Sequence, residues 1–255
     1  MLLPKVTPGR TTVKNLLSTA LLPAGRTLYV YGGGWNYLDT GAGPQSTTLG
    51  YSPSWAYFFR QQDANYDYRR FRGDGCNPYY DSGLDCSGYL GWVIYNTLRC
   101  QSGGTGFVFP SSHFALALAQ FQLGIHLETV HPLRSGDLFS MNGHVWLCVG
   151  HCPDGSMVIL HSSPSPSILG KPGGGVQLSA IGLDNHCQAA HLARTYMARL
   201  APEWLMRYSI MVYPHDQYTS VANSCGGSFL WSNVLSDPEQ LRTRPAQVIL
   251  SQLFS

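Results

Sequence analysis

The chain has 255 residues, of which 44% are hydrophobic and 12% are charged, and its formal net charge at pH 7 is +2. This composition excludes a disordered chain and predicts a folded core in one domain, or in one domain with a large insertion. The charge is too weak to imply a nucleic-acid or membrane-surface partner, and no apolar stretch is long enough to span a membrane.

A basic segment followed by an apolar one, near the N-terminus, has the outline of a secretory signal peptide. Its apolar residues recur with helical spacing after a residue that can cap a helix, Thr11 or Thr12. They are Val13, Leu16, Leu17, Ala20 and Leu21. We therefore expect an amphipathic helix packed on the core and no clear signal peptide.

A short β-type run, residues 27–35, follows and ends in a glycine cluster, where we expect a turn or the wall of a pocket. Residues 36–83 are rich in Tyr, Gly, Asp, Asn and Arg without sustained periodicity, which indicates an elaborated loop region that forms an insertion. Its stretch of aromatic and basic residues at 66–71 either covers a site or packs within the insertion.

The next segment carries the clearest chemical signal. Asp85 is a favourable helix N-cap, and apolar residues at 89–93 repeat with helical spacing. Cys86 then lies in the first turn of a helix, where unpaired N–H groups and the helix dipole stabilise a thiolate. We expect this position to lower the pKa of Cys86.

After a second predicted helix near 114–122, strands dominate. Residues 135–147 form a predicted hairpin with an Asn-Gly turn at 142–143, so that His144 opens its second strand. A further strand, 156–161, follows an Asp-Gly turn. If these strands are antiparallel neighbours, His144 and His161 lie side by side, and the second ring can orient the first.

The remaining chain predicts a loop over 162–175, a helix over 187–200 and a strand over 208–213. The last forty residues give no clear assignment. The glycine runs at 32–34 and 173–175 lack the Lys-Ser/Thr of a phosphate loop.

Less specific interpretations apply to the same residues. A lone His in a strand is more often a surface or core residue, and a lone Cys is more often a small apolar side chain. Cys148, Cys152, His144 and His151 also suggest a zinc site, but no second cysteine pair has metal-ligand spacing, so we expect no metal.

Three segments in this order resemble the NlpC/P60 family of papain-like cysteine peptidases. They are Leu84-Asp85-Cys86-Ser87-Gly88-Tyr89, the Gly136-Asp137 strand before Gly143-His144-Val145, and Leu28-Tyr29-Val30-Tyr31-Gly32-Gly33. The matching pattern runs from about residue 13 to residue 161. Asp-Cys-Ser-Gly at a helix start and a Gly-Asp…His hairpin rarely arise together.

The resemblance implies an α+β, papain-like NlpC/P60 fold in which the nucleophile helix packs on a central antiparallel sheet. One catalytic domain would span 1–255, with 36–83 as an insertion and possible lid and 162–255 as a C-terminal extension. The chain departs from the family in the length of the insertion, in Leu28 where Pro is common, and in having no SH3-like targeting domain before residue 13.

The resemblance also assigns roles. Cys86 would be the nucleophile, His144 the base and His161 the residue that orients it. Three further residues would bind substrate, and their family counterparts hold the ammonium of a free N-terminal L-alanine: Tyr29, Asp85 and Ser87. All three can accept hydrogen bonds from an ammonium group.

The implied function is hydrolysis of an amide in peptidoglycan stem peptides or muropeptides, between γ-D-glutamate and the diamino acid, without metal or organic cofactor. An amidase or acyltransferase acting on another cell-wall amide would use the same residues, and a non-catalytic wall-binding protein is the other alternative. The protein would act either in the cytoplasm, where muropeptides are recycled, or outside the cell after export by another route. The sequence does not determine the oligomeric state.

Overall fold

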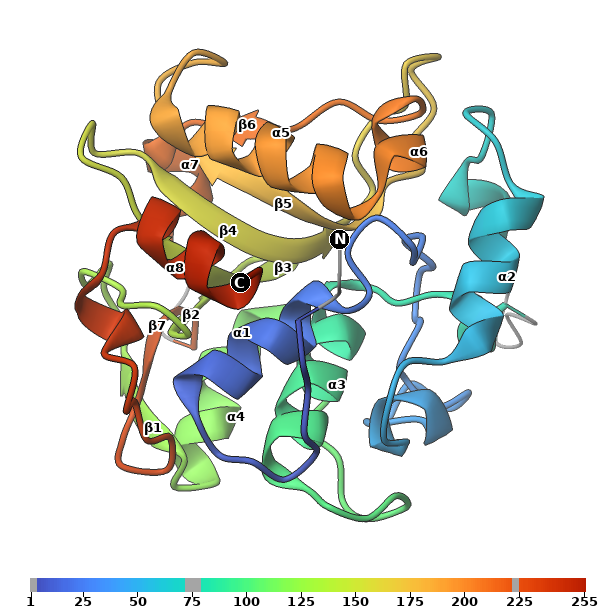
Figure 1. The fold of residues 1–255 in the computed structure, drawn as a ribbon. Helices are drawn as coiled ribbons and strands as arrows, with labels where there is room; N and C mark the ends of the chain where they lie inside the picture. Colours follow the sequence, from blue (N-terminus) through green and yellow to red (C-terminus); the bar gives the residue numbers. More distant parts are fainter. Residues whose placement is uncertain (1–3, 72–78, 222–224) are drawn as a thin grey trace.

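A computed structural model describes residues 4–71, 79–221 and 225–255. These residues form an α+β fold around a seven-stranded mixed sheet (Figure 1). In sheet order, its strands are β1 (Gly124–Leu127), β7 (Gly227–Trp231), β2 (Leu138–Met141), β3 (His144–His151), β4 (Met157–Ser163), β5 (Gly175–Ile181) and β6 (Val212–Tyr213). Neighbouring strands are antiparallel except β5 and β6, which are parallel.

Eight α-helices occur in the described part of the chain. They are α1 (Val13–Leu21), α2 (Pro53–Gln61), α3 (Cys86–Leu98), α4 (Phe114–Gln120), α5 (Gln188–Leu200), α6 (Pro202–Leu205), α7 (His215–Tyr218) and α8 (Ala246–Leu253). Among the described residues, no helix is both long and apolar enough to cross a membrane.

The two faces of the sheet are covered differently. Val145, Leu147 and Val149 of β3 point into the main core, which α1, α3, α5 and α8 complete on one side of the sheet (Figure 1). Trp146 and Cys148 point to the other face and belong to a smaller apolar cluster. The predicted alternation along β3 is confirmed, and it separates the helix-covered face from the face that carries His144.

The helices predicted after Thr12 and after Asp85 are confirmed, as α1 and α3. Thr12 caps α1 by accepting a hydrogen bond from the N–H of Asn15, and Asp85 caps α3 by accepting one from the N–H of Gly88. Capping satisfies N–H groups that would otherwise have no partner at a helix start. The predicted helices at 114–122 and 187–200 also form, as α4 and α5.

The β-type run expected at 27–35 does not become a strand of the sheet. The segment makes only isolated bridges, between Leu28 and Gly175 and between Trp35 and Ala42, and the turn expected at its glycine cluster forms. That cluster packs against the start of α3, where the carbonyl of Gly33 accepts the N–H of Asp85 at 3.0 Å. A Cβ on Gly88 would lie 1.9 Å from this carbonyl oxygen, so the close approach requires glycine at position 88.

The predicted hairpin is confirmed, with Met141 paired to His144 and Gly143 at a φ of 75° in its turn. The next predicted strand is β4, antiparallel to β3. His161 shares a face of β4 with Met157 and Ile159, and this is the face of the smaller apolar cluster.

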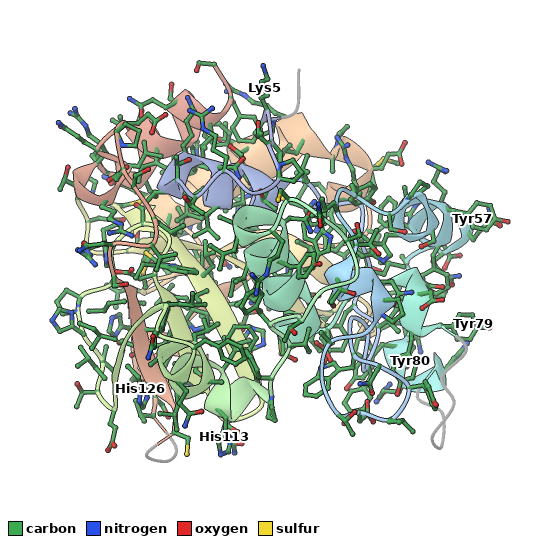
Figure 2. All side chains as sticks on the ribbon, turned by 90° about the horizontal axis from the view of Figure 1, so that it is seen from below. Lys5, Tyr57, Tyr79, Tyr80, His113 and His126 are labelled. Carbon is green, nitrogen blue, oxygen red and sulfur yellow. The ribbon has the colours of Figure 1, made fainter. Side chains whose placement is uncertain are left out.

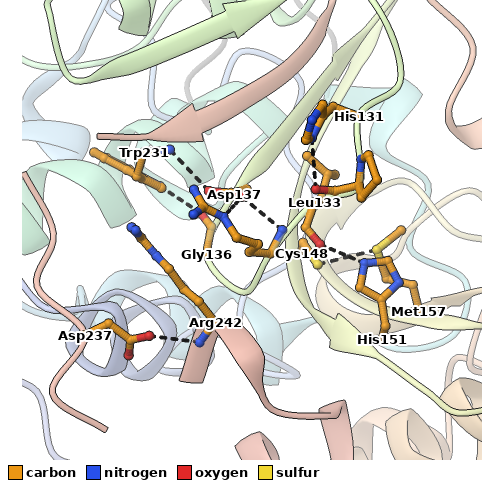
Figure 3. Close-up of polar contacts among 12 residues, drawn as sticks. His131, Leu133, Gly136, Asp137, Cys148, His151, Met157, Trp231, Asp237 and Arg242 are labelled. Carbon is orange, nitrogen blue, oxygen red and sulfur yellow. Dashed lines mark hydrogen bonds and ion pairs between the residues drawn. The ribbon is translucent and has the colours of Figure 1, made fainter. Parts of the chain in front are cut away.

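The Gly-Asp motif holds three strands together just before this hairpin. The buried Asp137 carboxylate accepts the backbone N–H groups of Arg134 at 2.9 Å and Trp231 at 3.2 Å (Figure 3). The Asp137 carbonyl accepts the N–H of Cys148 at 2.9 Å, and the Gly136 carbonyl accepts the indole N–H of Trp231 at 2.8 Å. The motif therefore joins β7 and β3 at the start of β2.

Other predictions need correction. The insertion is not loop throughout, because it contains α2, and its residues 72–78 lie outside the described part. Tyr66 packs inside it and donates a hydrogen bond to the carbonyl of Tyr29 at 2.8 Å. The strand predicted at 208–213 is reduced to the two residues of β6. Four further elements were not predicted, because their short apolar runs give too little periodicity: β1, β5, β7 and α8.

Candidate active site

A cavity of about 410 Å³ opens at the N-terminus of α3. Its walls come from segment 29–39, the first turn of α3, a 3₁₀ turn at Ser111–His113 and the β2–β3 turn. Four residues predicted to act on or bind a substrate line it: Tyr29, Asp85, Cys86 and Ser87. The structure thus brings these four residues together.

The thiol of Cys86 is almost completely buried, with 5% of the residue exposed. Burial, with a smaller contribution from the Asp85 carboxylate, raises its pKa well above the ordinary value, although the N–H groups of Val145 and Ser87 oppose the shift. The expected lowering of this pKa is wrong for the unliganded site. The loss of hydration on burial destabilises the thiolate more than the N–H groups at the helix start stabilise it. The thiol is protonated at neutral pH.

The two predicted histidines lie in direct contact. Nε2 of His144 is 2.8 Å from Nδ1 of His161, and Nε2 of His161 is 2.9 Å from the hydroxyl oxygen of Ser179 on β5. Burial lowers the pKa of His144 to about 4, and burial together with His144 lowers that of His161 well below its ordinary value. Both rings are therefore neutral at neutral pH.

This chain of contacts restricts where the protons lie. If His161 donates its Nε2 proton to Ser179, its Nδ1 accepts the Nε2 proton of His144. His144 then presents an unprotonated Nδ1, which has no hydrogen-bond partner among the described residues. In this tautomer His144 can accept a proton from a thiol.

Cys86 and His144 are neighbours without a direct hydrogen bond. The Cys86 thiol accepts the N–H of Val145, the residue after His144, and among the described residues no hydrogen bond joins the thiol to the His144 ring. Hydrogen bonds between a nucleophile and its base are often looser without substrate. Side-chain rotation would have to bring the two groups together.

The carboxylate of Asp85 is held from two sides. Its Oδ1 accepts the N–H of Gly88 at 2.7 Å and the hydroxyl of Ser87 at 3.0 Å, and the Ser87 oxygen accepts the indole N–H of Trp35 at 3.0 Å. Burial nevertheless raises the pKa of Asp85 to about 7. Ser87 therefore fixes the carboxylate within the cavity wall.

We expect the raised pKa of Asp85 to make folding stability depend on pH. The folded chain binds this proton more tightly than the unfolded chain does, so its contribution to the free energy of unfolding falls as the pH rises toward 7 and stays constant above it. Asp85→Asn keeps an oxygen acceptor but cannot ionise. Relative to wild type, it should gain about 2–3 kcal/mol between pH 5 and pH 8.

Urea unfolding of both proteins at pH 5 and pH 8 measures this gain. Subtracting the wild-type pH dependence from that of Asp85→Asn removes the other titrating groups. A difference that does not change with pH would show that Asp85 has an ordinary pKa.

Several lining residues were not predicted. Trp35 lies just before the insertion and Asp39 lies in it, and Asp39 accepts a hydrogen bond from the hydroxyl of Tyr80 at 3.3 Å. Figure 2 labels Tyr80 and His113, both in the lower part of the view. Because Asp39 lies in the insertion, part of the insertion forms a wall of the cavity. In the sequence, only Trp35 could have been expected at the cavity, because it directly follows the glycine cluster.

The residues of the alternative zinc site make other contacts. Cys148 lies against the Met157 sulfur at 3.4 Å, and Nε2 of His151 lies 2.7 Å from the carbonyl of Leu133 (Figure 3). Among the described residues, no three His, Cys, Asp or Glu side chains are grouped so that they could hold a metal ion.

Compared with known proteins, the chain matches no protein-family model, no curated protein and no solved structure. The chemistry of the site is therefore inferred from its own residues and from the motifs of the sequence.

Proposed function

We propose that the protein is a cysteine peptidase with a papain-like NlpC/P60 fold, and that it hydrolyses the γ-D-glutamyl bond to the diamino acid in peptidoglycan stem peptides. The observation that carries the proposal is the 2.8 Å contact between His144 Nε2 and His161 Nδ1, beside a cysteine at a helix start. When His144 donates through Nε2 in this contact, its Nδ1 is left as a base for the thiol.

In the proposed reaction, Cys86 Sγ attacks the γ-carbonyl carbon while its proton passes to Nδ1 of His144. Backbone N–H groups at the start of α3 stabilise the oxyanion. His144 then protonates the leaving amine, the C–N bond breaks and a thioester remains on Cys86. Water, which gives a proton to His144, hydrolyses the thioester and restores the thiol.

The composition of the cavity supports a substrate with a free amine. Asp85 and Asp39 line the cavity, and no Lys or Arg is found among its described lining residues. A bound ammonium would pair with Asp85 and would offset the burial that raises the pKa of this carboxyl. A free N-terminal L-alanine supplies such a group.

Product analysis tests the proposal directly. Defined muropeptides are incubated with the protein and their products are identified by mass spectrometry. We expect cleavage between D-glutamate and the diamino acid. Cleavage between glycan and L-alanine would indicate an amidase, transfer to an added amine would indicate an acyltransferase, and the absence of any product would favour a wall-binding protein.

We expect the enzyme to prefer free stem peptides that begin with L-alanine. An N-acetylated peptide leaves the buried Asp85 carboxylate without its cation, which costs about 1–3 kcal/mol, so kcat/KM should fall at least about 10-fold. The two peptides, L-Ala-γ-D-Glu-diamino acid and its N-acetyl form, are compared under identical conditions.

The Asp85→Asn variant provides the matched control, because it keeps the oxygen acceptor and removes the charge. We expect its kcat/KM to be nearly equal for the two peptides. Equal values for the wild-type protein would show that Asp85 does not recognise the amine and that glycan-linked peptides are suitable substrates.

A further inference from the structure

The C-terminal part of the chain places a tyrosine against the two histidines. The carbonyl of Tyr218, the last residue of α7, accepts the indole N–H of Trp146 at 3.1 Å, which attaches this short helix to β3. The Tyr218 ring stacks on Tyr213 of β6, with 3.7 Å between the ring centroids and 13° between the planes. Backbone and ring contacts thus fix where its hydroxyl lies.

The Tyr218 hydroxyl reaches the atom that joins the two histidines. Its oxygen lies 3.4 Å from Nδ1 of His161, the same nitrogen that contacts His144, and the Tyr218 and His144 ring centroids are 5.5 Å apart. The side chains of Tyr213 and Ser163 both form hydrogen bonds with the Tyr218 hydroxyl, and Cys86 is close enough to interact with it electrostatically. Burial keeps the Tyr218 hydroxyl protonated.

Two tautomers of the histidine pair satisfy the contact between the rings. In the first, His144 donates through Nε2 and its Nδ1 can accept the thiol proton. In the second, His161 donates through Nδ1, and neutral His144 carries its proton on the Nδ1 that the thiol needs. The Tyr218 hydroxyl also forms hydrogen bonds with the side chains of Tyr213 and Ser163. A Tyr218 proton directed at Nδ1 of His161, 3.4 Å away, is compatible only with the first tautomer.

We propose that Tyr218 is a positioning residue that selects the tautomer in which His144 acts as the base for Cys86. Its hydroxyl does so by donating to Nδ1 of His161, which favours the form of that ring with its proton on Nε2, directed at Ser179. The inference rests on the proposed role of His144. If Tyr218 has this role, the segment that carries β6 and α7 contributes to catalysis.

Tyr218→Phe tests this inference, because it removes the hydroxyl and keeps the ring that stacks on Tyr213. The ¹⁵N chemical shifts of labelled histidine distinguish protonated from unprotonated ring nitrogens. We expect the variant to shift the pair toward the tautomer with a proton on Nδ1 of His144. Peptide hydrolysis should show a kcat about 10-fold lower with an unchanged KM, and alkylation of Cys86 by iodoacetamide should slow.

Ser163→Ala is the second variant, since it removes one of the two other side-chain partners of the Tyr218 hydroxyl, and it should produce the same shift to a smaller extent. Tyr196→Phe is the matched control, because Tyr196 is a buried tyrosine of α5 stacked on Phe254 at 5.1 Å and lies outside the site. It should leave the ¹⁵N spectrum of the histidine pair and kcat unchanged.

Histidine tautomers that are unchanged in folded Tyr218→Phe and Ser163→Ala proteins would overturn the inference. The NMR and alkylation measurements need no peptide substrate. A wild-type protein that hydrolyses no muropeptide would therefore refute the proposed function, while the tautomer shift would still decide the role of Tyr218.

Discussion

Cys86→Ala should abolish hydrolysis while the chain stays folded. The side chain supplies the atom that forms the thioester, and no other described cysteine lines the cavity. Loss of a nucleophile lowers turnover by on the order of 10⁵-fold. The change removes only a sulfur atom from a site at the start of α3, so Asp85 still caps the helix and circular dichroism should show little change.

Cys100→Ala is the matched control for this experiment. Cys100 is a free, exposed thiol just after the end of α3, so its removal should leave kcat/KM unchanged. Iodoacetamide should inactivate the wild-type and Cys100→Ala proteins alike. Wild-type turnover by a folded Cys86→Ala protein would refute the covalent mechanism.

His144→Ala is expected to have the second largest effect. Cys86 is protonated in the unliganded site because burial raises its pKa, so attack requires a base that takes its proton. Without the His144 ring, kcat should fall by about 10³–10⁴-fold. The rate of Cys86 alkylation should fall as well, because the same proton must leave the thiol.

His161→Asn distinguishes orientation from charge at the neighbouring position. An amide can accept the Nε2 proton of His144 but cannot carry a charge, so partial activity would indicate that His161 acts by orienting the base. His191→Ala, which removes an exposed imidazole from α5, is the control and should change neither rate. Full activity in His144→Ala would exclude His144 as the base.

The local features around the site could be predicted from the sequence, because each depends on residues close together in the chain. Asp85 and the apolar residues after it define the start of α3, and the Asn-Gly pair defines the hairpin that His144 opens. Strand alternation then predicted that His144 and His161 share a face of the sheet. The roles of these residues as catalysts stay predictions.

Features that depend on distant segments could not be predicted in this way. The raised pKa of Cys86 results from burial, which is the sum of contacts from many parts of the fold and outweighs the local N–H groups of the helix. The β-type run expected at 27–35 pairs only through isolated bridges, while the turn expected at its glycine cluster forms and packs on Gly88 of α3.

By itself, the sequence determined the helix that begins at Cys86, the hairpin that His144 opens and the strand that carries His161, since capping, turn chemistry and side-chain alternation act over a few residues. Only the tertiary structure placed Ser179, Trp35 and Tyr218 at the site. Ser179 comes from β5, Trp35 from the segment just before the insertion and Tyr218 from α7, and no local pattern predicts that they meet. Packing of the sheet and its covering segments decides which of their polar groups meet the two histidines and Asp85.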